Sequence, residues 1–292
     1  MAINLKGPLY LSVAAAIWGG MYVASKYALE VVPPFTLLFL RYFFAAITLV
    51  LWCRQSKIEI VPQQDKGILF QIGFFGYFLS IAAQFIGTKL SSAHMGAVIT
   101  TLSPVFQSGF AILLLGEKIT TKQVIAIGLS LVGVLIITGV PGSDDGAAFY
   151  YGNLFFLLAA FLWGYYSVLS KKVAIRHPAL RITTWGIILA TIFAILPAIS
   201  EINTWNAEVL TSLPVVFSIG YLAVISTTIA YYCWNKGLSL MNPHQAGLFF
   251  FFQSIVGSIL GYFVLDESLS LAFFGGSFLI IAGVYFILKN DG

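Results

Sequence analysis

The chain has 292 residues, of which 59% are hydrophobic, 16% aromatic and only 9% charged, whereas a soluble domain usually carries about 25% charged residues. This composition predicts an integral membrane protein, and two cysteines provide neither a disulfide framework nor a structural metal site, so we expect no metal and no cofactor. The net charge of +4 is interrupted by apolar stretches and forms no continuous basic face, which argues against a nucleic-acid partner.

A helix needs roughly 20 apolar residues to cross about 30 Å of hydrocarbon. Windows of this kind, bounded by charges, prolines or polar clusters, predict an all-α fold of ten transmembrane helices. Their ranges are 8–29, 34–53, 67–87, 92–115, 121–139, 150–172, 179–199, 213–235, 243–264 and 270–288. The first range is longer than a usual signal-peptide core and no clear cleavage site follows it, so we expect it to be a retained helix. The short connections leave no room for a soluble domain.

Basic residues are distributed unevenly between the two sets of connections. With the N-terminus in the cytoplasm, twelve lysines and arginines lie in cytoplasmic loops or ends, and only Lys26 and Lys89 lie outside. Because cytoplasmic loops normally carry the excess of basic residues, we expect both termini on the cytoplasmic side of the plasma (inner) membrane.

Two groups of residues recur along the chain. The residues Trp18, Gly19, Ser25, Lys26 and Pro33 recur 145 positions later as Trp163, Gly164, Ser170, Lys171 and Pro178. The residues Gly87, Leu90, His94, Ser108, Glu117 and Gly133 recur 150 positions later as Gly237, Leu240, His244, Ser258, Glu267 and Gly283. Each half would hold five spans, an odd number, so the second half would enter the membrane inverted. We therefore predict two inverted five-helix repeats, residues 1–145 and 146–292, with a substrate site near the midplane.

These repeated motifs resemble a known family. The Trp-Gly pairs, the pair Arg41-Tyr42, Pro104 and the turns at 115–117 and 265–267 look like the EamA-type repeats of the drug/metabolite transporter superfamily, over nearly the whole chain. The resemblance implies a secondary transporter, an exporter or exchanger of amino acids or related small organic metabolites, that works by alternating access around a central cavity. The second half departs from the pattern, with Gly186 in place of the arginine, so a strictly symmetric mechanism is not expected.

Polar side chains within apolar spans are candidate substrate contacts, because hydrocarbon cannot satisfy them. Arg41 lies about 10 Å along the second helix and could hold a substrate carboxylate; the alternatives are that it extends to the headgroups or pairs with Glu30. The uncharged candidates are Gln84, Thr100, Ser103, Gln107 and Gln253. Thr100, Ser103 and Gln107 share one helical face, which hydrogen bonds between helices would also explain.

Aromatic residues supply the other candidates. They form pairs at helical spacing, Trp18 with Tyr22, Trp163 with Tyr166, and Tyr231 with Trp234. Trp and Tyr often form interfacial belts, but Trp18 and Trp163 fall near the middle of their spans. Around a midplane cavity such rings would bind apolar or cationic groups by stacking and cation-π contact.

Acidic residues and histidines indicate how transport could be coupled to a source of energy. No acidic residue lies at the middle of a span, so proton antiport through a midplane carboxylate is not predicted. His94 and His244 are the candidates for coupling, with a structural role as the alternative, and Glu117 and Glu267 are expected to stabilise turns.

We find no pattern of a membrane enzyme, so catalysis is not expected. A passive channel or facilitator for small solutes is the alternative function, and assembly as a homodimer is left open.

Overall fold

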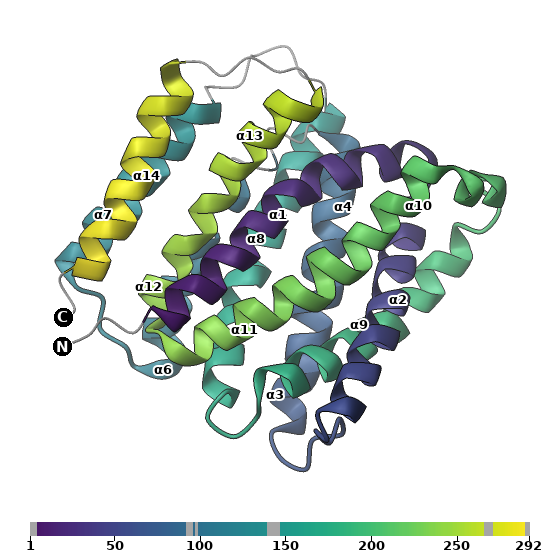
Figure 1. Cartoon of the computed structure of the whole chain (residues 1–292), viewed down its shortest axis with the longest axis horizontal. Coiled ribbons are helices and arrows are strands. Elements are labelled where there is room, and N and C mark those ends of the chain that lie inside the picture. Colours follow the sequence, from purple (N-terminus) through teal and green to yellow (C-terminus); the bar gives the residue numbers. More distant parts are fainter. Residues whose placement is uncertain (1–4, 92–95, 97–98, 139–146, 266–270, 290–292) are drawn as a thin grey trace.

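Long apolar runs, separated by prolines and charged residues, form helices throughout this chain. The computed structural model describes residues 5–91, 96, 99–138, 147–265 and 271–289, and these residues contain no β-strand (Figure 1). The fold over this part of the chain is therefore all-helical.

The described residues of the first half form single helices and one continuous rod in which α-helical and π-helical segments follow one another. The bounds are α1 (Lys6–Val31), α2 (Pro34–Gln55), the rod α3 (Lys66–Gln71), η1 (Ile72–Leu79) and α4 (Ser80–Leu90), then α6 (Ser103–Leu115) and α7 (Thr121–Thr138). The second half follows the same order. It begins with α8 (Ala147–Val173), α9 (Ala179–Ser200) and a short 3-10 helix (Ala207–Thr211). A first rod follows, made of α10 (Leu213–Gly220), η3 (Tyr221–Ile229) and α11 (Ala230–Leu240). A second rod is made of α12 (Pro243–Leu248), the 3-10 turn η4 (Phe249–Phe251) and α13 (Phe252–Leu265), and the last helix is α14 (Leu271–Lys289).

A helix is present in every range that the sequence predicts, although residues 92–95 and 97–98 of the fourth range lie outside the described residues. Among the described helices, five are long and apolar enough to cross a membrane: Pro34–Gln55, Lys66–Leu90, Phe149–Val173, Ala179–Ser200 and Leu213–Leu240. Three further apolar helices are shorter. The positions of the helices are thus as predicted, and the number that cross the membrane stays a prediction.

Proline and glycine set several helix ends at equivalent places in the two halves. Pro33 and Pro178 precede α2 and α9 in extended conformations, because each proline fixes its own φ and cannot donate to a preceding helix. Gly116 ends α6 with a φ of 67°, a left-handed conformation that suits glycine, and so forms the predicted turn before α7.

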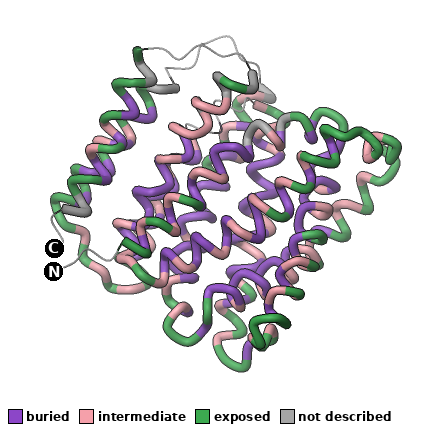
Figure 2. The backbone as a smooth tube through the Cα atoms, in the orientation of Figure 1, coloured by how far each residue is buried: buried purple, intermediate pink, exposed green. Residues whose placement is uncertain are grey.

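The helices of one half pack against those of the other in matching pairs. Helix α1 packs on α11 and α13, while its counterpart α8 packs on α4 and α6. Helix α2 packs on α9, and α7 packs on α14 at one edge of the molecule (Figure 1). Buried residues follow these contacts through the middle of the bundle (Figure 2). The centre of the protein is therefore built from both halves together.

Two glycines allow the central helices to approach closely. A Cβ atom added at Gly164 would lie 2.6 Å from the backbone nitrogen of Gln107, and one added at Gly19 would lie 2.9 Å from the backbone oxygen of Gln253. Both distances are too short for a side chain, so backbone packs directly on backbone. These contacts bring the neighbouring residues Trp18 and Trp163 to the interface between the halves.

Both composite rods α3–η1–α4 and α10–η3–α11 contain π-helical turns at equivalent positions. The segments η1 and η3 begin at Ile72 and Tyr221, 149 positions apart, and end at Leu79 and Ile229, 150 positions apart. A π-helical turn is rare and often accompanies a functional site. Here each turn lies next to the other half's second helix, η1 against α9 and η3 against α2.

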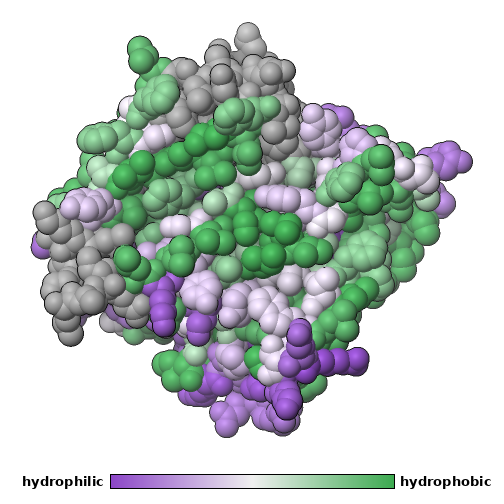
Figure 3. Space-filling model, in the orientation of Figure 1, coloured by the Kyte–Doolittle hydropathy of each residue, from purple (hydrophilic) through white to green (hydrophobic). Residues whose placement is uncertain are grey.

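The outer surface separates apolar and hydrophilic regions. Figure 3 shows hydrophobic side chains over much of the visible face and hydrophilic side chains gathered along its lower edge. Large apolar residues on α7 and α14, such as Leu135 and Phe278, are exposed, at 51% and 71%. Such a surface suits contact with lipid rather than with water.

Candidate functional site

A cavity lies at the centre of the bundle, between the two halves. The first half contributes Trp18 and Met21 from α1, Ser80, Ile81 and Gln84 from α4, Ser103 at the start of α6, and Thr100 three residues before it. The second half contributes Ala159, Ala160 and Trp163 from α8, Tyr231 from α11, Phe250 from η4 and Gln253 from α13. Seven of the residues predicted to bind substrate, Trp18, Gln84, Thr100, Ser103, Trp163, Tyr231 and Gln253, therefore converge here.

This cavity is narrow in the present conformation. It encloses about 360 Å³ of space between protein atoms when its open mouth is counted, but the centre of a water molecule can lie in only about 20 Å³ of it. The second volume decides what fits, because one water needs about 10–15 Å³ on that scale. A small metabolite would therefore need the lining side chains to move apart.

Aromatic rings form most of the apolar wall. The rings of Trp18 and Trp163 meet edge to face, with centroids 5.0 Å apart. Tyr231 lies 5.5 Å from Trp18 and 5.7 Å from Trp163, and Phe250 lies about as close to both. Each ring contacts several others, so the movement of one requires the others to repack.

The polar part of the wall carries both acceptors and a donor. The hydroxyls of Ser80, Ser103 and Thr100 donate to backbone oxygens, of Ala159, Thr100 and Gly96 respectively, which leaves their oxygens available as acceptors. The indole N–H of Trp18 donates to the backbone oxygen of Ser226 at 3.0 Å. The buried indole N–H of Trp163 has no partner in the part of the chain that the structure describes. This unpaired donor beside the cavity is suited to a ligand oxygen.

Arg41 lies behind the aromatic wall and is completely buried. Its Nε donates to Oγ1 of Thr227 at 2.6 Å, and its guanidinium lies 5.9 Å from the centre of the Tyr231 ring. Glu30 is exposed and makes no ion pair with it. The two alternatives for Arg41, extension to the headgroups and pairing with Glu30, are therefore wrong. Packing between α2 and η3 holds the guanidinium inside the protein.

Three predicted site residues lie beside the cavity but do not line it. Gln107 donates from Nε2 to the backbone oxygen of Pro243 at 2.6 Å, so it joins two helices, as the alternative interpretation of its helical face suggests. Trp234 donates to Oγ of Ser167 at 3.3 Å and packs on Trp18. Tyr166 takes part in a hydrogen-bond network described next. Hydrogen bonds to other helices orient the polar groups of these three residues away from the cavity in this conformation, and their role in substrate binding stays a prediction.

The network behind the wall is centred on Tyr77 and Asn235. Tyr166 donates from its hydroxyl to Oδ1 of Asn235 at 2.9 Å, while Nδ2 of Asn235 donates to the hydroxyl of Tyr77 at 2.8 Å and to Oγ1 of Thr183 at 2.9 Å. The two tyrosine hydroxyls lie 3.0 Å apart. This network links helices of both halves directly beneath Tyr231. Sequence reasoning missed Tyr77 and Asn235, although each is a polar side chain within an apolar span.

Three of the predicted residues are not described in full. His94 and Glu267 lie outside the described residues, and nothing is described of the Tyr22 side chain. His244 is buried at the first turn of α12, and neither ring nitrogen has a hydrogen-bond partner among the described residues. His244 is therefore enclosed by protein, with α12 packed against α6, and its part in coupling stays a prediction.

Glu117 lies in the turn after α6, as predicted, but its partner comes from the other half. Its carboxylate accepts a hydrogen bond from Nδ2 of Asn242 at 3.0 Å. The start of α7 is capped by Thr120 and Gln123, which bond to each other's backbone N–H groups. Glu117 therefore joins the halves as well as stabilising its own turn.

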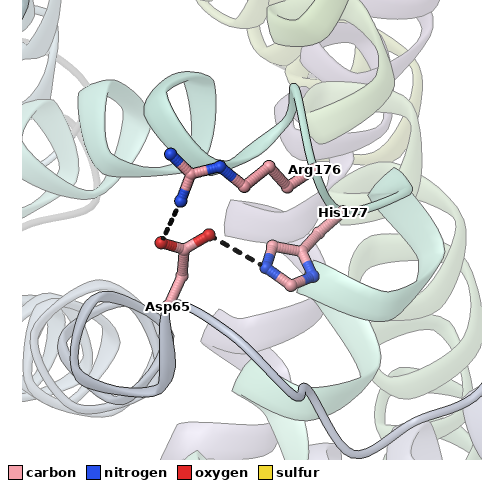
Figure 4. Close-up of polar contacts among 3 residues, drawn as sticks. All are labelled: Asp65, Arg176 and His177. Atoms are coloured by element: carbon pink, nitrogen blue, oxygen red, sulfur yellow. Dashed lines mark hydrogen bonds and ion pairs between the residues drawn. The ribbon is translucent and has the colours of Figure 1, made fainter.

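Ion pairs join the halves at the same end of the bundle. The carboxylate of Asp65 lies 2.8 Å from Arg176 and 3.2 Å from the ring of His177, so the α2–α3 connection is tied to the α8–α9 connection (Figure 4). Arg181 also donates to the backbone oxygen of Glu59 at 2.6 Å. All the ion pairs of the described residues lie in this region. Within the same residues, no group of three or more His, Cys, Asp or Glu could hold a metal ion.

Comparisons with known proteins agree with this architecture. The chain is 25% identical over 289 residues to an "Uncharacterized transporter" of Archaeoglobus fulgidus, with 97% of each chain covered. It is 24% identical over 276 residues to a protein of Salmonella typhimurium named "Probable amino-acid metabolite efflux pump", covering 92% of this chain and 90% of that one. A solved structure titled "Crystal structure of protein" matches with a TM-score of 0.80 at 22% identity, over 96% of each chain. The last match shows the fold.

The family description covers nearly the whole chain. Residues 5–139 and 150–289 each match the EamA-like transporter family. The names of the relatives point to transport rather than catalysis, and the apolar helices make the chain an integral membrane protein. The chain therefore belongs to the EamA-like transporter family, consistent with the drug/metabolite transporter superfamily.

Proposed function

We propose that this protein is a secondary transporter that exports or exchanges amino acids or related small organic metabolites across the cytoplasmic membrane by alternating access. The observation that carries the proposal is the central cavity, to which both halves contribute aromatic and polar side chains. A site shared between two halves can open to either side when the halves rock against each other. The name of the Salmonella typhimurium relative supports an amino-acid metabolite as the cargo.

We further propose ten spans in two inverted repeats, with both termini in the cytoplasm. The matching helix pairs, the two π-helical turns and the two matches to the family support this duplication. Orientation rests on the excess of basic residues in one set of connections. Cysteines placed at Lys57 and at Ser143, which lies outside the described residues, should react with impermeant reagents from opposite sides of the membrane. Labelling of both from one side would refute the inverted arrangement.

The contacts between the halves support a state that is closed on the proposed cytoplasmic side. The Asp65 ion pairs, the Glu117–Asn242 hydrogen bond and the Gln107–Pro243 hydrogen bond all lie toward that side of the cavity. Opening toward the cytoplasm would have to break these contacts. In this proposed state, these contacts hold the halves together at the cytoplasmic end, and the aromatic side chains of the cavity wall close the site.

Exchange in proteoliposomes tests the function. Vesicles loaded with an unlabelled mixture of amino acids and related organic acids should accelerate uptake of the matching labelled compounds, whereas a channel would show no acceleration and no saturation. Trp163→Ala should abolish this exchange in protein that is still inserted and folded, because the cavity loses its central ring. Tyr151→Ala, on the same helix α8 but 58% exposed, is the matched control and should transport normally. Unchanged exchange in both Trp18→Ala and Trp163→Ala would remove the basis for this site.

We propose exchange or facilitated transport, with proton coupling confined to His94 or His244. Every acidic residue that the structure describes lies at a helix end, in the short 3-10 helix or in a connection, and none of them lines the cavity. Uptake with and without an imposed pH gradient tests this. Strong accumulation that disappears in Glu117→Gln would show that Glu117 is a coupling residue.

A further inference from the structure

No acidic side chain among the described residues forms an ion pair with Arg41. Arg41 is the only buried Lys, Arg, Asp or Glu side chain among the described residues. The ion pairs of those residues involve Asp65 and Glu59, which lie at one end of the bundle. A guanidinium stays charged at any physiological pH, and burying a charge without a counter-ion costs several kcal/mol. A group retained at this cost inside a membrane protein is a candidate for ligand binding.

Most N–H groups of Arg41 lack a short hydrogen bond among the described residues. A guanidinium has five N–H donors, and only the bond from Nε to Thr227, at 2.6 Å, is short. Its Nη1 reaches Sδ of Met21 at 3.4 Å, and its Nη2 reaches the two oxygens of Ser226 at 3.5 Å. The two terminal nitrogens, which bind a carboxylate with two parallel hydrogen bonds, therefore have only long contacts here.

Arg41 contacts the cavity through two of its lining residues. Met21, whose sulfur touches the guanidinium, lines the cavity, and so does Tyr231, whose ring lies 5.9 Å from the guanidinium carbon. Trp18, also in the wall, donates to the same backbone oxygen that Arg41 approaches. A shift of the flexible Met21 side chain would therefore open the guanidinium to the cavity, because methionine readily changes rotamer.

The equivalent place in the second half carries no charge. Gly186 corresponds to Arg41 at the offset of 145, and the ring of Tyr77 fills the space where a side chain at Gly186 would begin. Tyr77 itself corresponds at the offset of 150 to Thr227, the partner of Arg41. The pair arginine and threonine in one half is thus replaced by glycine and tyrosine in the other. The positive charge lies on one side of the cavity only, so a ligand with one charged end would bind in one orientation.

The described residues that line the cavity carry no negative charge for an ammonium group. The polar ones are Ser, Thr and Gln, and none of them is Asp or Glu. From the buried cation without an ion pair among the described residues, its contact with the wall and the lack of an acidic residue in the described lining, we propose that the cavity selects organic anions and that Arg41 binds the substrate carboxylate. This inference rests on the proposed transport function and, within the proposed range of amino acids and related small organic metabolites, selects those whose net charge is negative. Zwitterions and amines with the same apolar part should bind less well.

Three ligands with one phenyl ring each test the selectivity of the unaltered protein. They are 3-phenylpropionate, phenylalanine and phenethylamine, which differ only in carrying the carboxylate, both charged groups or the ammonium. Thermal unfolding of detergent-purified protein at increasing ligand concentration gives the relative affinities, because a ligand that binds the folded state raises the unfolding temperature. We expect 3-phenylpropionate to bind about tenfold more tightly than phenethylamine, because one charge-assisted hydrogen bond contributes roughly this factor to the affinity. Equal or tighter binding of phenylalanine or phenethylamine, or no stabilisation by 3-phenylpropionate, would overturn the proposal.

Substitutions in α2 test whether Arg41 is the source of this selectivity. Arg41→Gln should lose about tenfold or more of the affinity for 3-phenylpropionate, with phenethylamine affinity unchanged, and Arg41→Lys should keep part of the preference. Arg54→Gln, an exposed arginine on the same helix, is the control and should bind like the unaltered protein. If folded Arg41→Gln keeps the full preference for the acid, the assignment is wrong. Selective binding of 3-phenylpropionate, without uptake of the labelled acid into proteoliposomes that contain the unlabelled acid, would leave this inference standing and remove the transport function.

Discussion

Replacement of Gly164 by alanine tests whether direct backbone packing of α8 on α6 builds the cavity wall. A Cβ atom at Gly164 would lie 2.6 Å from the backbone nitrogen of Gln107 and 2.8 Å from Cβ of Phe106. Ordinary contacts begin at 3.4 Å, so the helices would have to separate by the difference between 2.6 and 3.4 Å, about 0.8 Å. Because the nearest atoms are backbone, a rotamer change cannot relieve the contact.

Overpacking of this kind costs about 1–3 kcal/mol, which should lower the unfolding temperature in detergent by several degrees. Gly109→Ala is the matched control, because it lies on α6 and nothing lies within 4 Å of an added Cβ. That control should be neutral or stabilising by up to about 1 kcal/mol, since alanine favours a helix over glycine. Equal unfolding temperatures for the two variants would refute the reasoning. Since Trp163 precedes Gly164, exchange by the folded Gly164→Ala protein should also slow.

Three further substitutions test the contacts around the cavity. Tyr77→Phe removes a hydroxyl that accepts from Asn235 and should destabilise the protein by about 1–3 kcal/mol, measured by thermal unfolding; no change would mean that the network is dispensable. Glu117→Gln should be more stable than Glu117→Ala by about 1 kcal/mol, because glutamine retains an oxygen for Asn242, and the opposite order would contradict this contact. Asp65→Asn should change stability by less than about 1 kcal/mol, since Arg176 is exposed, but should speed exchange by up to about fivefold by easing separation of the halves. Slower exchange would count against the closed state proposed here.

The sequence by itself determined the helices and much of the cavity lining. Helix positions follow from the lengths of apolar runs and from breaks such as Pro33 and Gly116, which act over a few residues. The lining follows in part from the rule that polar or indole groups within an apolar span require partners, which selected Trp18, Gln84 and Trp163.

Only the tertiary structure decided what each polar group contacts. In sequence Arg41 is one cation in a helix, and whether it reaches the headgroups or stays buried depends on η3, about 185 residues further along the chain. Likewise Gln107 and Tyr166 have the same local pattern as true lining residues, but they bond to Pro243 and Asn235 in other helices. A helical pattern specifies which face a side chain occupies, whereas its partner is set by the helix that packs on that face.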